Sequence, residues 1–310
     1  MSLPLSYPGL KCVLENLEAV KRVHIIARAP GLQKIDKLKP LRLEDFYVVD
    51  STKMIINDLT INYYKDEEVE FEMHPKTSIR QRAESLREKI KKLINYYFCE
   101  RSIIHVGELC WLDPKFHAFL PVDLKFRVNS LTAAYRHHLD TAILFIDPRS
   151  FPLKTLTIYP DTLTFDNQVV KSAEILIFNL FMDRIVTVEE LKKLSNKKVE
   201  VELRSSSRID IIPLIKYHVE TKKVIETTFI ISTDDKDFLN ENLREFELAF
   251  SEFKCDLDDV NERFLPGSSR FSIPINNEFR IQVYAIEDPE EDCPYQIIVK
   301  PVSIEAPIST

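Results

Sequence analysis

The densest group of residues that could carry out chemistry lies between residues 105 and 117. His105 falls in a predicted strand, and Cys110, Asp113 and His117 follow it, beside the chain's one tryptophan, Trp111. Thiolates, carboxylates and imidazoles are the usual ligands of zinc. The intervals between these residues match no familiar zinc-ligand spacing, however, and Cys110 falls at an inward position of the strand. We therefore expect structural roles for these side chains and no metal site.

Other catalytic signals are absent. The chain has four glycines, and neither a GxGxxG loop nor a GxxxxGK phosphate-binding loop can be written. Nucleophile motifs such as GxSxG and metal pairs such as HExxH are also missing. The acidic run at 287–292 lacks the ligand spacing of a calcium loop and predicts a solvated turn. The sequence thus predicts a protein without a catalytic residue, a metal or a cofactor, which is not an enzyme.

Composition limits the partners. The chain has 310 residues, of which 45% are hydrophobic and 29% are charged, and its net charge is -7. This balance argues against a nucleic-acid partner, which requires clustered excess Lys and Arg. No apolar run is as long as a membrane span, and the N-terminus lacks the pattern of a signal peptide. The five cysteines contain no CxxC pair and indicate reduced thiols. We expect a cytoplasmic or nuclear protein without a membrane partner.

The first elements are short amphipathic helices within residues 1–40. Leu10, Val13, Leu14 and Leu17 recur at helical spacing, and a second helical pattern ends at Pro30. About thirty residues are too few to bury a core of their own. The outward leucines of this segment therefore need either the following domain or a partner.

Residues 41–100 predict a strand pair and a charged helix that link the first segment to a receptor. The strands are expected at 41–49 and 54–64, with Asn57-Asp58 as a turn in the second run. The acidic stretch 67–74 is expected to be exposed. Apolar residues at three- and four-residue intervals then predict a helix over 78–97.

Residues 101–310 predict an α/β receptor domain. Its strand candidates have centres roughly 20 to 28 residues apart, the range of leucine-rich-repeat units. Helical patterns lie between them, which favours parallel pairing. We predict a leucine-rich-repeat-like, curved, mainly parallel sheet with outer helices, and a non-repetitive α/β sheet is the alternative. The strand candidates are 103–109, 124–131, 153–158, 175–180, 199–203 and 228–232, and the helical patterns are 136–146, 187–194, 209–221 and 238–253.

The C-terminal part predicts an antiparallel β cap over about 266–305. Its strands are expected at 271–275, 279–286 and 295–304, and Asn276-Asn277 between the first two is a hairpin signal. Such a hairpin would cover the last edge of the sheet.

In a curved parallel sheet, the outward residues of successive strands form an array that binds a protein surface. The predicted members carry mixed charges, which suits recognition of a target protein. These target-binding candidates are Lys125, Arg127, Asn129, Thr155, Thr157, Glu200, Glu202 and Arg204. The alternative is that they are simply solvated strand faces.

The first segment resembles an F-box, the helical module that binds a Skp-type adaptor and attaches a receptor to a cullin-RING ubiquitin ligase. The residues that carry the likeness are Pro8, Leu10, Val13, Leu14, Leu17, Arg22, Ile25, Arg28 and Leu32. The tryptophan found near the end of many F-boxes is absent. The resemblance implies adaptor contacts at Leu5, Pro8, Leu10, Val13, Leu14, Leu17 and Ile25.

Over nearly its whole length the chain also resembles a nematode-expanded family of F-box-associated proteins, whose receptor half is a domain of unassigned function. Four blocks in the same order carry this likeness: 4–15, 40–43, 79–82 and 151–158. The family implies an adaptor role through its F-box and gives no target. The sequence thus predicts a non-enzymatic substrate receptor of a ubiquitin ligase. The alternative is a free-standing interaction or scaffold protein whose N-terminal helices only cap the sheet.

Overall fold

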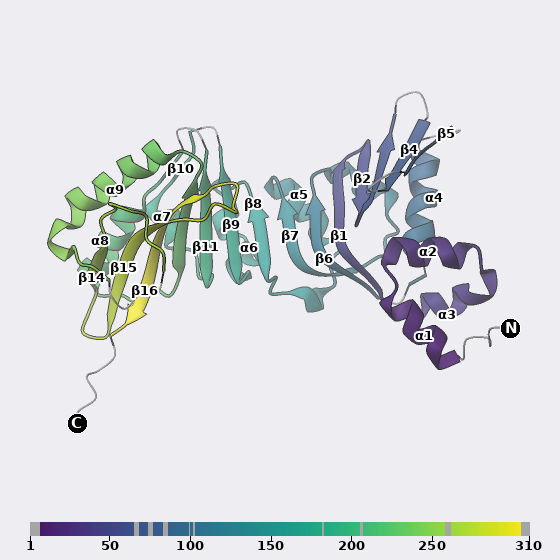
Figure 1. The fold of residues 1–310 in the computed structure, drawn as a ribbon, viewed down its shortest axis with the longest axis horizontal. Helices are drawn as coiled ribbons and strands as arrows, with labels where there is room; N and C mark the ends of the chain where they lie inside the picture. The colour runs from purple at the N-terminus through teal and green to yellow at the C-terminus, as the bar shows by residue number, and fades with distance from the viewer. Residues whose placement is uncertain are drawn as a thin grey trace. The chain divides into compact units, whose positions relative to one another are not determined.

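The computed structural model describes residues 7–64, 68–73, 77–82, 86–98, 100–101, 103–181, 183–204, 207–257 and 262–304. The chain divides into two compact units, residues 1–153 and 154–310 (Figure 1). The boundary lies inside the region 101–310 that the sequence predicts as one receptor domain. Each unit is a mixed α/β structure built on a β-sheet.

The first unit begins with helices and continues as a sheet with one long helix. Its helical elements are α1 (Tyr7–Asn16), α2 (Ala19–Ala27), η1 (Pro30–Leu32), α3 (Gln33–Lys37), α4 (Leu86–Phe98), η2 (Pro114–Phe119), α5 (Arg136–Ile143) and η3 (Pro148–Ser150). Its strands are β1 (Leu41–Asp50), β2 (Lys53–Ile56), β3 (Leu59–Tyr63), β4 (Glu68–Met73), β5 (Thr77–Arg82), β6 (Ile104–Trp111) and β7 (Phe126–Ala133).

The sheet of the first unit has both parallel and antiparallel parts. Its strand order is β7-β6-β1-β2-β3-β4-β5. The strands β7, β6 and β1 are parallel, and β1 to β5 form an antiparallel meander. Phe46, Phe98 and Phe126 form the centre of the core beneath it, with ring centroids 5.2 to 5.6 Å apart. The core therefore joins β1, β7 and α4.

Three sequence predictions for residues 41–100 were wrong. The predicted turn at Asn57-Asp58 is confirmed, with φ 50° at Asn57, and it divides the second run into β2 and β3. The predicted strand pair is nevertheless too short, because β4 and β5 extend it to a five-stranded meander. The stretch 67–74, expected to be exposed, contains β4, whose Val69 and Glu70 are buried. The predicted helix 78–97 begins only at Leu86, because residues 77–82 form the edge strand β5.

The parallel pairing of β1, β6 and β7 has one irregular level, at Glu44, Gly107 and Asn129. These three residues have no paired Cα partner, although the residues on either side of each of them pair in a constant register. A Cβ atom on Gly107 would lie 2.6 Å from the carbonyl oxygen of Glu44, which is closer than side chains tolerate. Glycine at this position therefore permits the close approach of β6 to β1.

The second unit repeats strand and helix before a final antiparallel section. Its strands are β8 (Thr155–Ile158), β9 (Ile175–Leu180), β10 (Ile185–Val186), β11 (Lys198–Leu203), β12 (Arg208–Ile209), β13 (Thr228–Thr233), β14 (Phe271–Pro274), β15 (Phe279–Glu287) and β16 (Tyr295–Ser303). Its helices are η4 (Thr164–Asp166), α6 (Gln168–Ser172), α7 (Val188–Leu191), α8 (Ile211–Thr221), α9 (Lys236–Phe250) and η5 (Ser251–Phe253).

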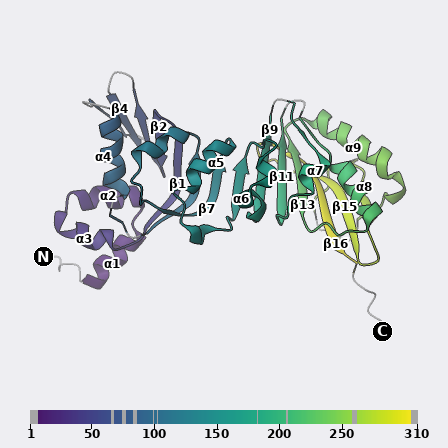
Figure 2. The same cartoon turned by 180° about the vertical axis from the view of Figure 1, so that it is seen from behind.

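The main sheet of the second unit has the strand order β8-β9-β11-β13-β16-β15-β14. Parallel pairing is confirmed for β8, β9, β11 and β13. The antiparallel pairing of the last three strands is also confirmed, and β16 joins them to β13. Figure 2 views this unit from the side on which α6, α7 and α8 lie. Alternate strand residues such as Leu176, Phe178 and Val201 are fully buried.

Two neighbouring segments of this unit are aligned in a constant register. Ile175 of β9 pairs with Lys198 of β11, and Ile185 of β10 pairs with Arg208 of β12. Both offsets are 23 residues, so the segments that contain β9-β10 and β11-β12 lie side by side as equivalent units. The short strands β10 and β12 form a separate two-stranded parallel sheet.

Candidate functional site

Helix α2 is the element that attaches the N-terminal helices to the sheet of the first unit. Glu18 caps its start, because its carboxylate accepts hydrogen bonds from the backbone N–H groups of Val20 (2.8 Å) and Lys21 (2.9 Å). The same carboxylate accepts a hydrogen bond from the side-chain amide of Asn57 at 2.7 Å. The turn between β2 and β3 therefore fixes the position of this helix start.

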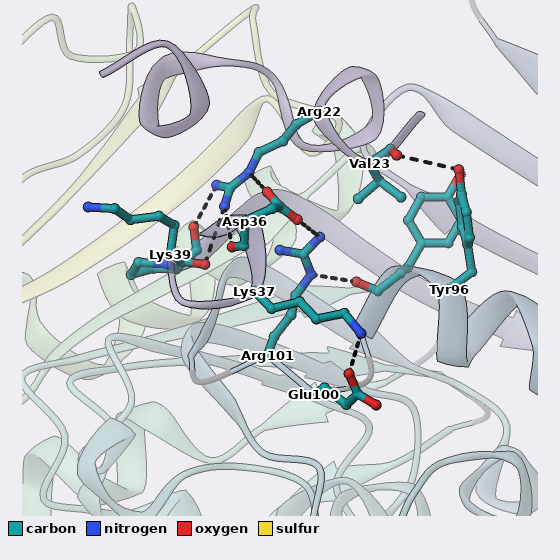
Figure 3. Close-up of polar contacts among 10 residues, drawn as sticks. Arg22, Val23, Asp36, Lys37, Lys39, Tyr96, Glu100 and Arg101 are labelled. Atoms are coloured by element: carbon teal, nitrogen blue, oxygen red, sulfur yellow. Dashed lines mark hydrogen bonds and ion pairs between the residues drawn. The ribbon is translucent and has the colours of Figure 1, made fainter. Parts of the chain in front are cut away.

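A buried ion cluster holds the helices in place (Figure 3). Arg22 Nε lies 2.5 Å from Asp36 Oδ1, and Arg101 Nη2 lies 2.8 Å from Asp36 Oδ2. Arg22 also donates to the carbonyl oxygens of Asp36 and Pro40. Burial lowers the pKa of Arg101, and the nearby carboxylate of Asp36 acts in the opposite direction. One carboxylate thus joins α2, α3 and the segment after α4.

The predicted adaptor contacts divide into exposed and buried residues. Val13 and Ile25 keep 47% and 50% of their surface exposed. Leu17 is half-buried, whereas Leu14 is only 2% exposed and is therefore not available to a partner. Leu5 lies outside the described residues, and so do the side chains of the two remaining contacts, Pro8 and Leu10.

The target-binding candidates on β7 make contacts within their own unit. Arg127 Nε lies 3.3 Å from Asp147 Oδ2, and the ammonium of Lys125 donates to the carbonyl oxygen of Leu144. Asn129 is exposed at the irregular level of the sheet. Hydrogen bonds from Arg149 and then from Arg127 hold the pKa of Asp147 well below its usual range.

The other candidates occupy neighbouring positions on the second unit. Thr157 and Glu200 both pair in register with Ile177, so β8, β9 and β11 bring them onto one row. Thr155 lies on the adjacent row, which contains Ile175. Glu202 lies one row further along β11, and Arg204 follows the strand. The structure therefore brings these five candidates onto one face of the sheet.

The centre of that face is acidic. Burial raises the pKa of Glu202, and the neighbouring Glu200 raises it further, while Arg204 lowers it. Glu200 has an ion pair with Lys198 at 3.0 Å and accepts a hydrogen bond from Ser232 at 3.4 Å. The face therefore presents carboxylates with partial compensation from two cations.

The residues first considered for zinc chemistry have structural contacts. Trp111 is fully buried and donates a hydrogen bond to the hydroxyl of Thr141 at 3.1 Å. Asp113 caps η2 through the backbone N–H of Lys115 at 2.8 Å, and burial raises the pKa of the Cys110 thiol to about 11. Within the described part of the chain, no group of three His, Cys, Asp or Glu side chains could hold a metal ion.

The two histidines of this region, His105 and His117, have different surroundings. Burial, followed by the charges of Arg42 and Arg127, lowers the pKa of His105. His117 Nδ1 lies 2.5 Å from the carbonyl oxygen of Pro114 within η2. The imidazole of His117 thus takes part in the local structure of η2.

Comparisons with known proteins give one match. A family model described as a domain of unknown function (DUF3557) matches residues 85–235, which is just under half of the chain. No curated protein and no solved structure matches the chain. Among the described helices, none has the length and apolar character needed to cross a membrane.

Sequence reasoning missed the buried ion cluster. A signal for it was present, because Arg22 lies between Ala19 and Ile26 on the apolar face of α2, where a charged side chain requires a partner. The partners Asp36 and Arg101 are distant in sequence and carry no comparable signal. The exposed Leu38, next to α3, was also missed.

Proposed function

We propose that this protein is a non-enzymatic substrate-recognition adaptor of a cullin-RING ubiquitin ligase. In this proposal the N-terminal helices bind a Skp-type adaptor, and the second unit binds a target protein. The protein would act in the cytoplasm or the nucleus, as a member of the nematode-expanded F-box-associated family that the sequence resembles.

The exposure of Val13 and Ile25 carries the proposal. Each keeps about half of its side-chain surface in solvent, while Leu14 and Ile26, their neighbours in sequence, are buried within the chain. The helices thus remain attached to the first unit and still present apolar side chains on both α1 and α2. Apolar residues of this kind are the anchors that a helical groove or helix bundle of a partner buries.

The sheet of the second unit supplies the proposed target-binding surface. The constant offset of 23 residues between β9-β10 and β11-β12 falls in the range of solenoid repeats. We infer a leucine-rich-repeat-like curvature for these strands, with Thr155, Thr157, Glu200, Glu202 and Arg204 on the recognition face. A target surface rich in Lys and Arg suits the carboxylates at its centre.

The second candidate function is a free-standing interaction protein, in which the helices only complete the first unit. The buried side chain of Leu14 and the ion cluster around Asp36 favour this alternative. The adaptor proposal remains open because an attached helix can still bind a partner through its outer face.

A binding experiment separates the two functions. The purified chain is incubated with an immobilised Skp-type adaptor, and the bound fraction is compared with that of a Val13→Asp/Ile25→Asp double variant. We expect the wild-type chain to bind and the double variant to lose about tenfold or more in affinity, because each charge would have to be desolvated in the interface. Absence of wild-type binding would support the free-standing alternative.

The matched control is a double variant at apolar residues outside the N-terminal helices. Val122 and Leu248 are strongly exposed, one in each unit. Val122→Asp/Leu248→Asp therefore adds the same charges and is expected to bind the adaptor like the wild-type chain. Equal loss in both double variants would indicate a non-specific effect of charge and would reject the proposed surface.

A further inference from the structure

A pocket of about 570 Å³ opens in the first unit, where α2, α4, β3 and β4 meet. Both ribbon views show α4 beside β4 (Figures 1 and 2). The apolar lining of the pocket comes from Leu59 on β3, Phe71 and Met73 on β4, and Leu93 and Tyr97 on α4. The volume lies within the range of small-molecule sites, which are mostly apolar with a few polar groups.

Basic side chains line the same pocket from two helices. Lys21 and His24 on α2 and Arg28 at its C-terminal cap follow each other at three- and four-residue intervals, which places them on one face. Lys89 and Lys92 have the equivalent spacing on α4. The lining described for this pocket includes no carboxylate.

Three of these cations lack a counter-ion among the described residues. No ion pair joins Lys21, Arg28 or Lys92 to a described carboxylate, although ion pairs of this kind are frequent elsewhere in the chain. A cluster of uncompensated cations beside an apolar lining is complementary to a molecule that has both an anionic and an apolar part.

Hydrogen bonds connect the aromatic side chains of the pocket to α2. His24 Nε2 lies 3.0 Å from the hydroxyl of Tyr97. The hydroxyl of Tyr96 donates to the carbonyl oxygen of Val23 at 3.4 Å (Figure 3). Burial and then the charge of Arg28 lower the pKa of His24, while the carboxylate of Glu18 acts in the opposite direction. The permanent positive charge at the rim comes from the lysines and the arginine.

We propose that this pocket binds an amphipathic anion, a small molecule with an apolar chain or ring and a carboxylate or phosphate group. The apolar body lies against Leu93, Phe71 and Met73, and the anionic group lies near Arg28 and Lys92. This site is independent of the proposed adaptor function, since it uses none of the predicted adaptor contacts. A pocket of this volume accommodates one small molecule.

Isothermal titration of the full chain with defined amphiphiles tests the site. The probes are dodecanoate and dodecyl phosphate, each used below its micelle concentration. We expect saturable binding of both at one site. Acetate and inorganic phosphate, which lack the chain, and dodecanol and dodecyltrimethylammonium, which lack the negative charge, are expected to bind at least about tenfold more weakly. Equal binding of the cationic amphiphile would overturn the proposal, as would no binding of either anion.

Two variants locate the site. Arg28→Glu/Lys92→Glu is expected to weaken dodecanoate binding by about tenfold or more, because it replaces attraction by repulsion at the rim. Tyr96→Ala, at a partly exposed side chain, tests the aromatic lining without a change of charge. The control Lys115→Glu/Lys154→Glu changes two exposed lysines outside the pocket. Unchanged dodecanoate binding in both pocket variants would place the ligand elsewhere and reject the pocket.

The two proposals fail separately. Adaptor capture is read out with Val13→Asp/Ile25→Asp, which leaves the pocket lining intact, and dodecanoate binding of that variant is expected to equal the wild type. A protein that captures the adaptor but binds no anionic amphiphile would overturn only the pocket. Thermal unfolding of each variant confirms that lost binding is not lost folding.

Discussion

Arg22 and Asp36 form an ion pair of 2.5 Å in which the two side chains are only 2% and 1% exposed. Such a pair has little net effect on stability when it is replaced as a whole, but removal of one charge leaves the other buried without a partner. In this chain the cost is larger, because the same carboxylate also compensates Arg101. The attachment of the N-terminal helices thus depends on one aspartate.

We expect Asp36→Asn to lower the free energy of unfolding by about 3 to 5 kcal/mol, because two guanidinium groups would lose their counter-charge. Chemical denaturation followed by circular dichroism measures this change. The control is Lys37→Met, which removes the exposed surface pair with Glu100 and should leave stability close to that of the wild type. Similar stability of the two variants would contradict the central role of Asp36.

Gly107→Ala should destabilise the protein by about 1 to 3 kcal/mol, because the new methyl group would press on the Glu44 carbonyl oxygen. The control is Gly31→Ala, where no heavy atom lies within 4 Å of the added carbon. That variant is expected to remain within about 1 kcal/mol of the wild type. Thermal unfolding compares them, and an equal effect at both sites would disprove the close approach.

Asn196 ties successive segments of the second unit together. Its buried amide donates to the carbonyl oxygens of Val170 (2.8 Å) and Ala173 (2.6 Å). Asn196→Ala would leave both acceptors unpaired, and we expect a loss of about 2 to 4 kcal/mol. Ser195→Ala removes only an exposed hydrogen bond of 3.3 Å and serves as the neighbouring control. Denaturation midpoints that coincide for the two variants would contradict this assignment.

Glu202→Gln should stabilise the protein slightly at neutral pH. The pKa of Glu202 is raised by burial and then by Glu200, so the folded state holds a proton more tightly than the unfolded state does. The contribution of Glu202 to stability is therefore fully present below the ordinary glutamate pKa. It decreases as the pH rises through the pKa that Glu202 has in the folded state. Because 27% of the side-chain surface is exposed, solvent screening limits the gain to about 0.5 kcal/mol.

Unfolding of Glu202→Gln and wild type at pH 4 and pH 7 checks the sign. The stabilisation should be present at pH 7 and smaller at pH 4, where the wild-type carboxyl group is largely protonated. Glu189→Gln, at an exposed residue of α7, is the control. A stabilisation that grows as the pH falls would refute the explanation.

The strands of the second unit could be predicted because their sequence pattern is strong. Residues 175–180 are mostly β-branched and large apolar residues, and residues 198–203 alternate charged and apolar residues, so both stretches predict strands. The predicted strand 175–180 agrees with β9 at both ends. The antiparallel strands at the C-terminal end could be predicted equally well, since Asn276 forms a recognisable turn between two apolar runs.

The charged part of the first unit could not be predicted in the same way. Residues 77–82 contain Arg80 and Arg82, which are typical of an exposed sheet edge but weaken the alternation that identifies a strand. Their apolar residue Ile79 also continues the three- and four-residue spacing of α4. Two patterns therefore merged into one predicted helix, and only the pairing of β5 with β4 separates them.

The candidate sites depended on tertiary contacts that are not visible in sequence. Helical spacing identified Val13 and Leu14 together, but only the packing of α1 shows that one is half exposed and the other buried. The pocket beside α4 was not predicted at all, because Arg28, Phe71 and Lys92 come from three separate elements. From sequence alone, the basic residues of α4 are equally typical of a solvated helix face.

The equal offsets of β9-β10 and β11-β12 restrict where the chain can gain or lose residues. An insertion at 187–197, between the two segments, would lengthen a connection and leave both pairings in step. A single insertion at 181–184 would instead move β10 relative to β12 while β9 stayed aligned with β11. Matching insertions at 181–184 and 204–207 would restore the alignment, so these two short connections are expected to change length only together.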